Sequence, residues 1–551
     1  MARGAPALRS AARAAPLLAP LAACALLFAP LLAHSQAQPP TPGTVLETVP
    51  GRRPPPPGPA QILFPREGEG RAVEPGGVRF TVYGFEFTGN TIFPQAQLRR
   101  VVERYLDLEL NLFELNAAAD AVTRFYRQQG YPVARAIIPA QRVADGVVHV
   151  EIVEGHIGNV RFDGNRRYSS AMLGARTAPL AAGSVVTMDQ LERSLLLLND
   201  LPGLTARATL EPGSAFGTTD AVVKVEEKPA DLLLQLSNAG RQEVGTARLD
   251  AGASLNNPIG IGDQITLREV RSQDNLFKYQ RIGYSLPLGA SGLRLAAARS
   301  TVDYSVAGEF ASLGIRGSVH GSEVGLSYPL VRGRLRNIVG SVGERYVKTE
   351  QTALGTPVSQ GSLQVMTASV SASWLQADSS ASTLNIAYSG NGRDNVGAVA
   401  RPDALKAQYN LEYTYLTGVS PHWDLFLRGQ VVTTRDAAPD TEKFGLGGPD
   451  SVRAYRSAEL RGDKGWLLST ELRRQFVVAD MGGVASLFYD WGGVNSQGFA
   501  GWDKLQGVGA GVAIFPARNV HLQAQIATPF QSRVPADGKR THVWITLAVQ
   551  F

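Results

Sequence analysis

Short stretches of alternating apolar and polar residues fill the chain from Asp231 to its end. The last stretch, "HVWITLAVQF", is the clearest example. Its apolar set consists of Val543, Ile545, Leu547, Val549 and Phe551, and its mixed set of His542, Trp544, Thr546, Ala548 and Gln550. One apolar face and one mixed face over about ten residues are typical of a transmembrane β-strand. A β-sandwich strand also alternates, but the length of this region and its end on the strand's own Phe551 favour a membrane barrel.

Turn residues set the spacing of these strands. The stretches "YSLPLGASGLRL" and "LSYPLVRGRLR" each place a short turn between alternating segments, at Pro287 and at Pro329. At about twenty residues for each strand and turn, residues 230–551 accommodate about sixteen strands, and bacterial barrels have an even number. The sequence therefore predicts an all-β transmembrane barrel of about sixteen antiparallel strands, with a lumen wide enough for water or for a plug.

A helical period replaces this alternation in the segment before the barrel. The strand-like "VRFTVYGFEFTGN" leads into the helical "FPQAQLRRVVERYL". A second helix is predicted to start at Asn111, with Glu114 at the capping-box spacing and Gly130 as its stop. Its apolar face carries Leu115, Ala118, Val122 and Phe125. Two strands, "VARAIIP" and "GVVHVEIVEG", complete this unit.

The same order of elements then recurs. "HIGNVRFDGN" echoes "VYGFEFTGN", Thr187 and Gln190 repeat the cap ahead of "LERSLLLLND", and "LTARATL" and "AVVKVEEKP" supply two final strands. Residues 78–155 and 156–229 are therefore predicted to be two β-α-α-β-β units in tandem. Such units could be plain periplasmic modules with no site of their own, and plain modules can still bind a partner through a strand edge.

Residues 1–37 have the pattern of a signal peptide. Arginines precede a long apolar stretch, and small residues offer cleavage after Ala37. A lipoprotein site at Cys24 is the alternative, but the apolar run continues past that residue. Cys24 is the single cysteine, so this cleavage would leave no disulfide. Because no later run is long enough for a spanning helix, we expect an exported protein that is soluble or crosses the outer membrane as a barrel.

A proline-rich linker is predicted over residues 38–77. Ten prolines fall between Pro39 and Pro65. Such a run is incompatible with a regular helix, so polyproline II or no fixed structure is expected, with a short plug segment at most.

Composition excludes several classes of function. The net charge of +6 is mild and dispersed, so no nucleic-acid partner is predicted. No P-loop, HExxH or CxxC spacing occurs, and the histidines lack a Ser/His/Asp context, so we predict no cofactor, no metal and no enzyme activity. The segment "GVGAGV", residues 507–512, resembles part of a dinucleotide fingerprint but lacks the following helix. It is predicted to be a strand with small inward residues.

Two charged segments stand out within the barrel region. In "GVASLFYDWGGV", strand parity separates Ala485, Leu487 and Tyr489 from Ser486, Phe488 and Asp490. A carboxylate on the lipid side costs a few kcal/mol, so Asp490 is expected in the lumen, where it needs a partner. Arg453, in "SVRAYRSAELRGDKGW", is the candidate because a guanidinium forms a two-pronged pair. From the residues alone, other pairings stay open, including those of Glu471, and so does a solvated loop arginine.

Together these features resemble the TpsB transporters of two-partner secretion, within the Omp85 superfamily. The resemblance covers roughly residues 78–551, and its most specific motifs are "SVRAY" and "FYDWG". The first resembles the tip of the family's sixth extracellular loop, which folds back into the lumen, and the second resembles the wall motif whose aspartate receives the loop arginine. The resemblance implies a loop tip of Val452, Arg453, Ala454 and Tyr455, and a wall partner of Phe488 and Asp490. Phe551 is expected to act as an assembly signal.

The resemblance also implies a location and a function. The barrel would lie in the bacterial outer membrane, with two POTRA-like units in the periplasm. Those units would capture a large unfolded TpsA-like exoprotein, and the barrel would export it without nucleotide hydrolysis. The other expected partners are outer-membrane lipid and the barrel-assembly machinery. An assembly factor of the same superfamily, a passive channel or a surface receptor are the alternatives.

Two departures from the family pattern produce further expectations. Ala454 stands where the family usually has glycine, and a positive φ there would strain the loop tip. Many members carry an N-terminal plug helix, whereas the proline-rich linker argues against a long one.

Overall fold

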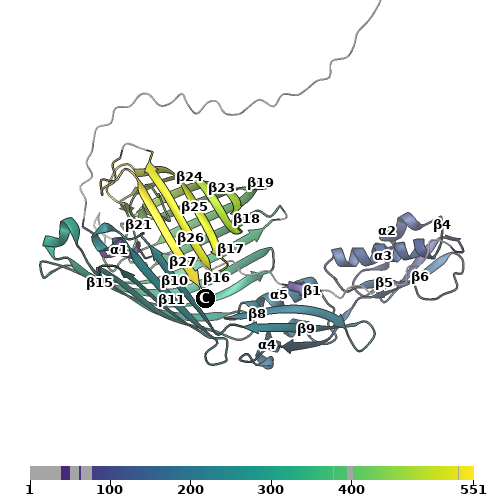
Figure 1. Cartoon of the computed structure of the whole chain (residues 1–551). Coiled ribbons are helices and arrows are strands. Elements are labelled where there is room, and N and C mark those ends of the chain that lie inside the picture. Colours follow the sequence, from purple (N-terminus) through teal and green to yellow (C-terminus); the bar gives the residue numbers. More distant parts are fainter. Residues whose placement is uncertain (1–38, 50–60, 64–76, 377, 394–400, 531–532) are drawn as a thin grey trace, which may run out of the picture.

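The computed structural model describes residues 39–49, 61–63, 77–376, 378–393, 401–530 and 533–551 (Figure 1). The predicted signal peptide, with Cys24, lies outside the described residues. Within the described part of the chain, no helix is long and apolar enough to cross a membrane.

Sixteen antiparallel strands form a closed barrel, which confirms the predicted fold class. Outward and inward positions follow the predicted parity, since Leu487 is 60% exposed whereas Phe488 and Asp490 are buried. In strand order, the barrel consists of β10 (Ala230–Ser237), β11 (Arg248–Asn256), β12 (Gln264–Ser272), β13 (Phe277–Pro287), β14 (Arg294–Ser305), β15 (Arg316–Arg332), β16 (Arg336–Ala353), β17 (Thr356–Leu375), β18 (Ala381–Gly390), β19 (Gln408–Ser420), β20 (Trp423–Thr434), β23 (Lys464–Val478), β24 (Met481–Asn495), β25 (Asp503–Ala517), β26 (Val520–Pro529) and β27 (His542–Gln550).

The first and last strands close the barrel. Residues 233–237 of β10 pair with residues 546–550 of β27. Phe551 extends this seam, because its backbone N–H and carbonyl both bond to Leu232, at 2.8 and 3.2 Å. The side chain of Phe551 is exposed on the outer face, as its strand parity predicts.

The first β-α-α-β-β unit, called unit 1 below, follows the predicted order with three differences. Its first predicted strand is divided into two, and a short additional strand between the two helices pairs with the first of these strands. Its first predicted helix ends at Val102 and continues as a 3-10 turn. The second helix begins after Asn111, which forms the predicted capping box with Glu114. Unit 1 contains β2 (Phe80–Val82), β3 (Gly84–Thr88), α2 (Gln95–Val102), η1 (Glu103–Tyr105), β4 (Leu108–Leu110), α3 (Leu112–Gln128), β5 (Arg135–Ile137) and β6 (Val147–Val153).

The second unit, unit 2, repeats this arrangement. It contains β7 (His156–Asp163), α4 (Ser170–Arg176), η2 (Ala178–Leu180), α5 (Met188–Asn199), β8 (Leu204–Pro212) and β9 (Thr218–Glu227). In each unit a glutamate at the end of the last strand accepts backbone N–H groups of the loop after the first strand. Glu154 accepts from Thr91 and Ile92, and Glu227 from residues 166–168. The two units therefore share this glutamate-to-loop contact as well as the order of their elements.

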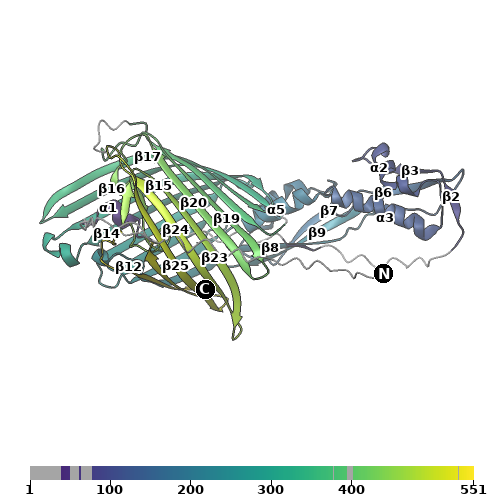
Figure 2. The ribbon, with the colours of Figure 1, turned by 90° about the horizontal axis from the view of Figure 1, so that it is seen from above.

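Units 1 and 2 lie in a row at one end of the barrel (Figure 2). Unit 2 contacts the short turns at this end. Arg332, at the end of β15, donates to both carboxylate oxygens of Asp200 at 2.6 and 2.9 Å. Arg167 donates to the carbonyl of Asn257 at 3.0 Å. With the two units on the periplasmic side, as the resemblance implies, the loops at the opposite end of the barrel are the extracellular loops.

The predicted absence of regular structure from the linker is wrong at two places. Residues Pro42–Leu46 form a short helix, α1, and Gln61–Leu63 form a strand, β1. Thr41 caps α1 and Pro42 occupies its first turn. A threonine cap followed by proline is a recognised start of a helix. The sequence therefore contained a local signal for α1, although the proline content of the linker as a whole argued against regular structure.

Candidate functional site

The sixth extracellular loop, residues 435–463, folds back into the barrel. It contains η5 (Asp440–Glu442), β21 (Phe444–Leu446) and β22 (Leu460–Gly462), and β21 pairs with β22. The turn after β21 needs glycine, because Gly447 and Gly448 have φ of +107° and +103°. A Cβ on Gly447 would also lie 2.2 Å from the carbonyl oxygen of Arg456. The tight turn lets residues 452–455 pack inside the lumen.

Arg453 lies against Asp490 of the inner wall. Its Nε and Nη2 donate to the two carboxylate oxygens at 2.8 and 2.7 Å, and its backbone N–H donates at 3.1 Å. Ser469 of β23 donates to the same carboxylate at 2.6 Å. Asp490 is 0% exposed. A fully buried carboxylate is stable only with such a set of donors, so this contact holds the loop tip to the wall.

Further contacts surround the Arg453 guanidinium. Glu471, which the sequence left open as a partner, accepts from its Nη1, and the ring of Phe488 lies 3.4 Å from its Cζ. The backbone carbonyl of Arg453 accepts from Nε1 of Trp544 at 2.8 Å. Strands β23, β24 and β27 therefore all contact one residue of the loop.

The condition under which Ala454 would strain the tip is not met. Ala454 does not have a positive φ, and Ala458 takes the left-handed conformation instead. Ala454 is fully buried against Gly507 of β25, where an added Cβ would lie 2.4 Å from the Ala454 Cβ. Gly509 leaves space for Phe488 in the same way. The small inward residues of "GVGAGV" therefore make room for the loop tip and for its aromatic support.

Val452 and Tyr455 complete the predicted tip. Both are fully buried in one apolar cluster with Ala454, Phe488 and Leu446. Apolar packing therefore holds Val452, Ala454 and Tyr455, and the ion pair with Asp490 holds Arg453 between them.

A second ion network, which the sequence reasoning missed, ties this loop to the first extracellular loop. Arg456 contacts Glu243 of η3 (Gln242–Val244), and Arg241 donates to the carbonyls of Ser457 and Ala458 at 3.0 Å. Burial raises the pKa of Glu243, but Arg241 and Arg456 together outweigh burial and hold that pKa below its ordinary value. No pattern of spacing pointed to this contact, because the two loops are far apart in the sequence.

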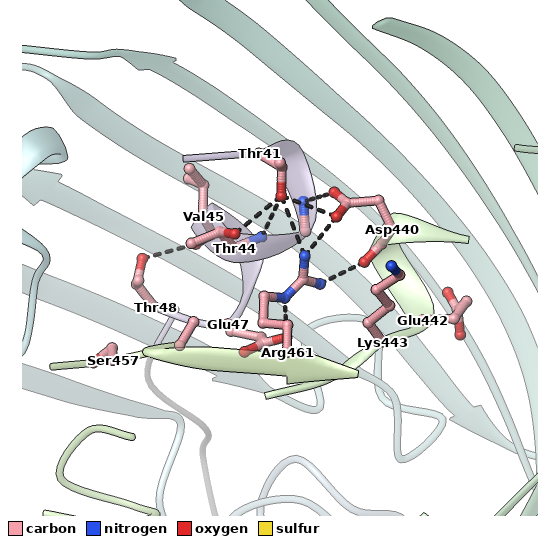
Figure 3. A network of polar contacts seen from close by, with 12 residues as sticks. Thr41, Thr44, Val45, Glu47, Thr48, Asp440, Glu442, Lys443, Ser457 and Arg461 are labelled. Carbon is pink, nitrogen blue, oxygen red and sulfur yellow. Dashed lines mark hydrogen bonds and ion pairs between the residues drawn. The ribbon is translucent and has the colours of Figure 1, made fainter. Parts of the chain in front are cut away.

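A third network joins the sixth loop to α1 (Figure 3). Arg461 of β22 donates to Glu47, at the end of α1, at 2.8 Å, and also pairs with Asp440 of η5. Asp440 in turn accepts from the backbone N–H of Gly43 at 2.6 Å and from the hydroxyl of Thr41 at 2.9 Å. Burial raises the pKa of Glu47 above its ordinary value, although Arg461 opposes this. One arginine and one aspartate thus hold a short helix inside the barrel.

The other side of α1 packs on the wall. Val45 is buried in an apolar cluster that includes Val270, Phe277 and Val302. Beside it, Arg248 of β11 donates from Nη1 to the carbonyl of Thr48 at 2.8 Å and stacks on Phe277. Arg248 is buried, and its Nε and Nη2 have no hydrogen-bond partner among the described residues. The helix therefore covers a cation whose hydrogen bonds are incomplete.

The space beside the loop tip is polar. A cavity of about 340 Å³ lies between the tip and strands β10, β26 and β27. Its lining includes Gln235, His521, Gln523 and Gln525. Hydrophilic walls around a loop and a short helix are expected of a water-filled interior that these two pieces obstruct.

Comparison with known proteins agrees with this architecture. The sequence profile described as "Haemolysin secretion/activation protein ShlB/FhaC/HecB" matches residues 217–514. The chain belongs to this family. A profile described as "POTRA domain, ShlB-type" also matches unit 1, at residues 80–155.

Individual relatives are transporters. The chain is 27% identical over 479 residues to the heme/hemopexin transporter protein HuxB of Haemophilus influenzae. The matched region covers 83% of this chain and 84% of HuxB. It is 24% identical over 425 residues to the hemolysin transporter protein ShlB of Serratia marcescens, covering 73% of each chain.

A solved structure of CdiB from Escherichia coli has the same fold. It superposes with a TM-score of 0.69 at 21% identity and covers 88% of this chain and 92% of CdiB. This transporter is thus a TpsB-type outer-membrane protein with periplasmic POTRA units, as the sequence motifs predicted, and the partners of its family are secreted exoproteins.

Proposed function

We propose that this transporter captures one large unfolded exoprotein in the periplasm through units 1 and 2 and passes it through the barrel lumen. The observation that carries the proposal is that two pieces of the chain obstruct the lumen without being part of the barrel wall. The sixth loop and α1 lie in a polar interior. Among the described residues, side-chain contacts hold them there, and neither pairs its backbone with a strand of the barrel wall. Pieces held in this way can leave without unfolding the barrel.

In this proposal, the Arg453–Asp490 pair keeps the loop tip at the wall until cargo arrives. The Arg461 network keeps α1 beside the same loop, so movement of the loop loosens the helix as well. Units 1 and 2 lie at the periplasmic end, where an unfolded chain would first arrive (Figure 2). Folding of the exoprotein outside the cell supplies the drive, with no nucleotide consumed.

Two further contacts belong to this proposal. The apolar outer face of the barrel contacts outer-membrane lipid, and Phe551, at the seam between β10 and β27, is recognised during assembly by the barrel-assembly machinery. The transporter has no catalytic role and no cofactor in this scheme.

Deletion of residues 78–228 tests the capture role. We expect export of the exoprotein to be lost while the barrel still inserts, because β10 begins after the deleted segment. The measurement is the exoprotein in the culture medium, and heat-modifiable migration of the barrel on gels is the folding control. Undiminished secretion by a folded barrel would contradict the proposal.

A further inference from the structure

The eighth extracellular loop, which joins β26 to β27, contacts the sixth loop beyond its tip. Glu459 of the sixth loop accepts from the backbone N–H of Ala536, in the eighth loop, at 2.7 Å. The other carboxylate oxygen of Glu459 accepts from Nε of Arg456 at 2.9 Å. One carboxylate therefore joins the returning part of the sixth loop to the eighth loop.

The depth of Glu459 makes this contact costly to break. Its side chain is only 1% exposed. A buried carboxylate needs protein donors, because water does not reach it. Among the described residues, the eighth loop supplies the donor to one oxygen of Glu459, and Arg456, which also pairs with Glu243, supplies the donor to the other. Separation of the two loops would therefore leave a buried oxygen without its donor.

A second contact between the two loops passes through the start of β27. His542 pairs with Asp537 of the eighth loop at 3.0 Å, and both side chains are buried. The ring of His542 stacks on Trp544, with the ring centroids 5.9 Å apart. Trp544 donates to the backbone carbonyl of Arg453 at the tip of the sixth loop. The eighth loop thus also positions the indole that the tip contacts.

The eighth loop is itself held by the barrel wall. Arg533 pairs with Asp503, at the start of β25, at 3.1 Å. The hydroxyl of Thr528, on β26, donates to the carbonyl of Arg540 at 3.0 Å. With the ion pair at the start of β27, these contacts join the eighth loop to three strands. The eighth loop is therefore an extension of the wall, and the sixth loop is the piece that can move away from it.

We propose that the eighth loop is a second attachment site for the sixth loop, and that Glu459 is the positioning residue which closes it. The sixth loop is then held at two places. Arg453 holds the tip to β24, and Glu459 holds the returning part to the eighth loop. Both contacts must break before the lumen opens to cargo. This inference rests on the proposed function, since it concerns the release of the resting loop.

Thiol labelling of intact cells tests whether Glu459 holds the loop. The reporter is Ser457→Cys, because Ser457 lies in the sixth loop close to Glu459 and is 6% exposed. We expect Glu459→Ala to raise the rate of labelling by a fluorescent maleimide at least about fivefold, because a hydrogen bond to a buried charge no longer opposes separation. Glu459→Gln retains an acceptor for Ala536 but loses the ion pair with Arg456, and should give an intermediate rate.

The control for this experiment is Glu309→Ala, which removes an exposed glutamate of the third extracellular loop and should leave the labelling rate unchanged. Heat-modifiable migration on gels shows that each barrel has folded. An unchanged rate in a folded Glu459→Ala variant would overturn the inference. Equal increases in both variants would also overturn it, because they would show a general loosening of the extracellular loops.

A reversible bridge tests whether the two loops must separate during export. The cysteine pair Glu459→Cys with Ala536→Cys is joined by a two-carbon bis-methanethiosulfonate, which a reductant removes. The pair Arg533→Cys with Asp503→Cys, joined in the same way, fixes the eighth loop to β25 and leaves the sixth loop free. We expect the first bridge to reduce exoprotein in the medium to the level set by the unbridged fraction, with recovery in reductant. The control bridge should have no effect.

The outcomes separate this inference from the proposed function. Secretion that continues with the first bridge in place would refute the need for separation while leaving export intact. Loss of secretion with the control bridge would show that the eighth loop must move as well, and would overturn its assignment as the fixed side. Deletion of residues 78–228 tests capture on its own, so a failure of the proposed function appears in that variant and not in the bridged ones.

Discussion

Two arginines of the sixth loop use the same chemistry in different surroundings. Arg453 meets Asp490 on a wall strand, and that carboxylate is 0% exposed. Arg461 meets Glu47 and Asp440, which lie on a short helix and on the loop itself and whose side chains are 25% and 39% exposed. The first pair joins the loop to the barrel, whereas the second joins two movable pieces to each other.

The effect of each ion pair therefore depends on how deeply it is buried and on whether its acidic partner lies on the barrel wall. Breaking a buried pair leaves an uncompensated charge, which costs about 3–5 kcal/mol, whereas exposed pairs contribute about 0–1 kcal/mol. On this basis we propose that Arg453 sets the resting position of the loop and that Arg461 sets how readily α1 leaves. Three substitutions test this difference.

Arg453→Ala is expected to have the largest effect. It leaves Asp490 buried with Ser469 as its remaining side-chain donor, so the tip should leave the wall and secretion should fall by about tenfold or more. Arg453→Lys is the matched control, because it retains the charge but not the two-pronged contact, and should show an intermediate loss. A charge swap between Arg453 and Asp490 should restore part of the activity. Normal secretion by a folded Arg453→Ala variant would show that the loop tip is not held as proposed.

Arg461→Ala should have a smaller effect of a different kind. Loss of a partly exposed network weakens the seating of α1 by about 1 kcal/mol, which corresponds to about a fivefold rise in the open population. Planar-bilayer conductance measures this rise, and Glu47→Gln should produce a similar one. Arg474→Ala, which removes an exposed arginine of β23, serves as the control. If conductance stays at the control level, Arg461 does not hold the helix.

Arg248→Met should have the smallest effect and the opposite sign. The substitution removes a buried cation with two unpartnered nitrogen atoms, at the expense of one hydrogen bond to Thr48. Replacing a buried charge by an apolar side chain is often neutral or stabilising, so α1 should sit more firmly and conductance should fall by about twofold. Arg271→Met, on the exposed outer face of β12, is the control. A rise in conductance would mean that the Thr48 contact outweighs the buried charge.

Local patterns predicted much of this molecule. Alternation identified the outward face of β27, and the parity of "FYDWG" placed Asp490 inside before any partner was known. The capping box at Asn111 located α3. These features depend on residues within a few positions of one another, which is why a single sequence reveals them.

The contacts that the sequence did not predict join residues far apart in the chain or depend on how closely two segments pack. Arg461 contacts Glu47 across a separation of 414 residues, and Arg456 contacts Glu243 across 213. The room for the Ala454 side chain depends on Gly507 of another strand. A short plug segment was allowed for in the linker, but the helical form of α1 was not predicted, because the proline count of the linker obscured a local cap signal at Thr41.

The sequence by itself determined the barrel, the two tandem units and the inward aspartate, because side-chain parity and caps are local consequences of backbone geometry. Only the tertiary structure decided which arginine holds the loop and which holds the helix, and that the eighth loop contacts Glu459 of the sixth. These outcomes depend on which charges and loops become neighbours once the chain closes on itself, and on how much water is excluded from them.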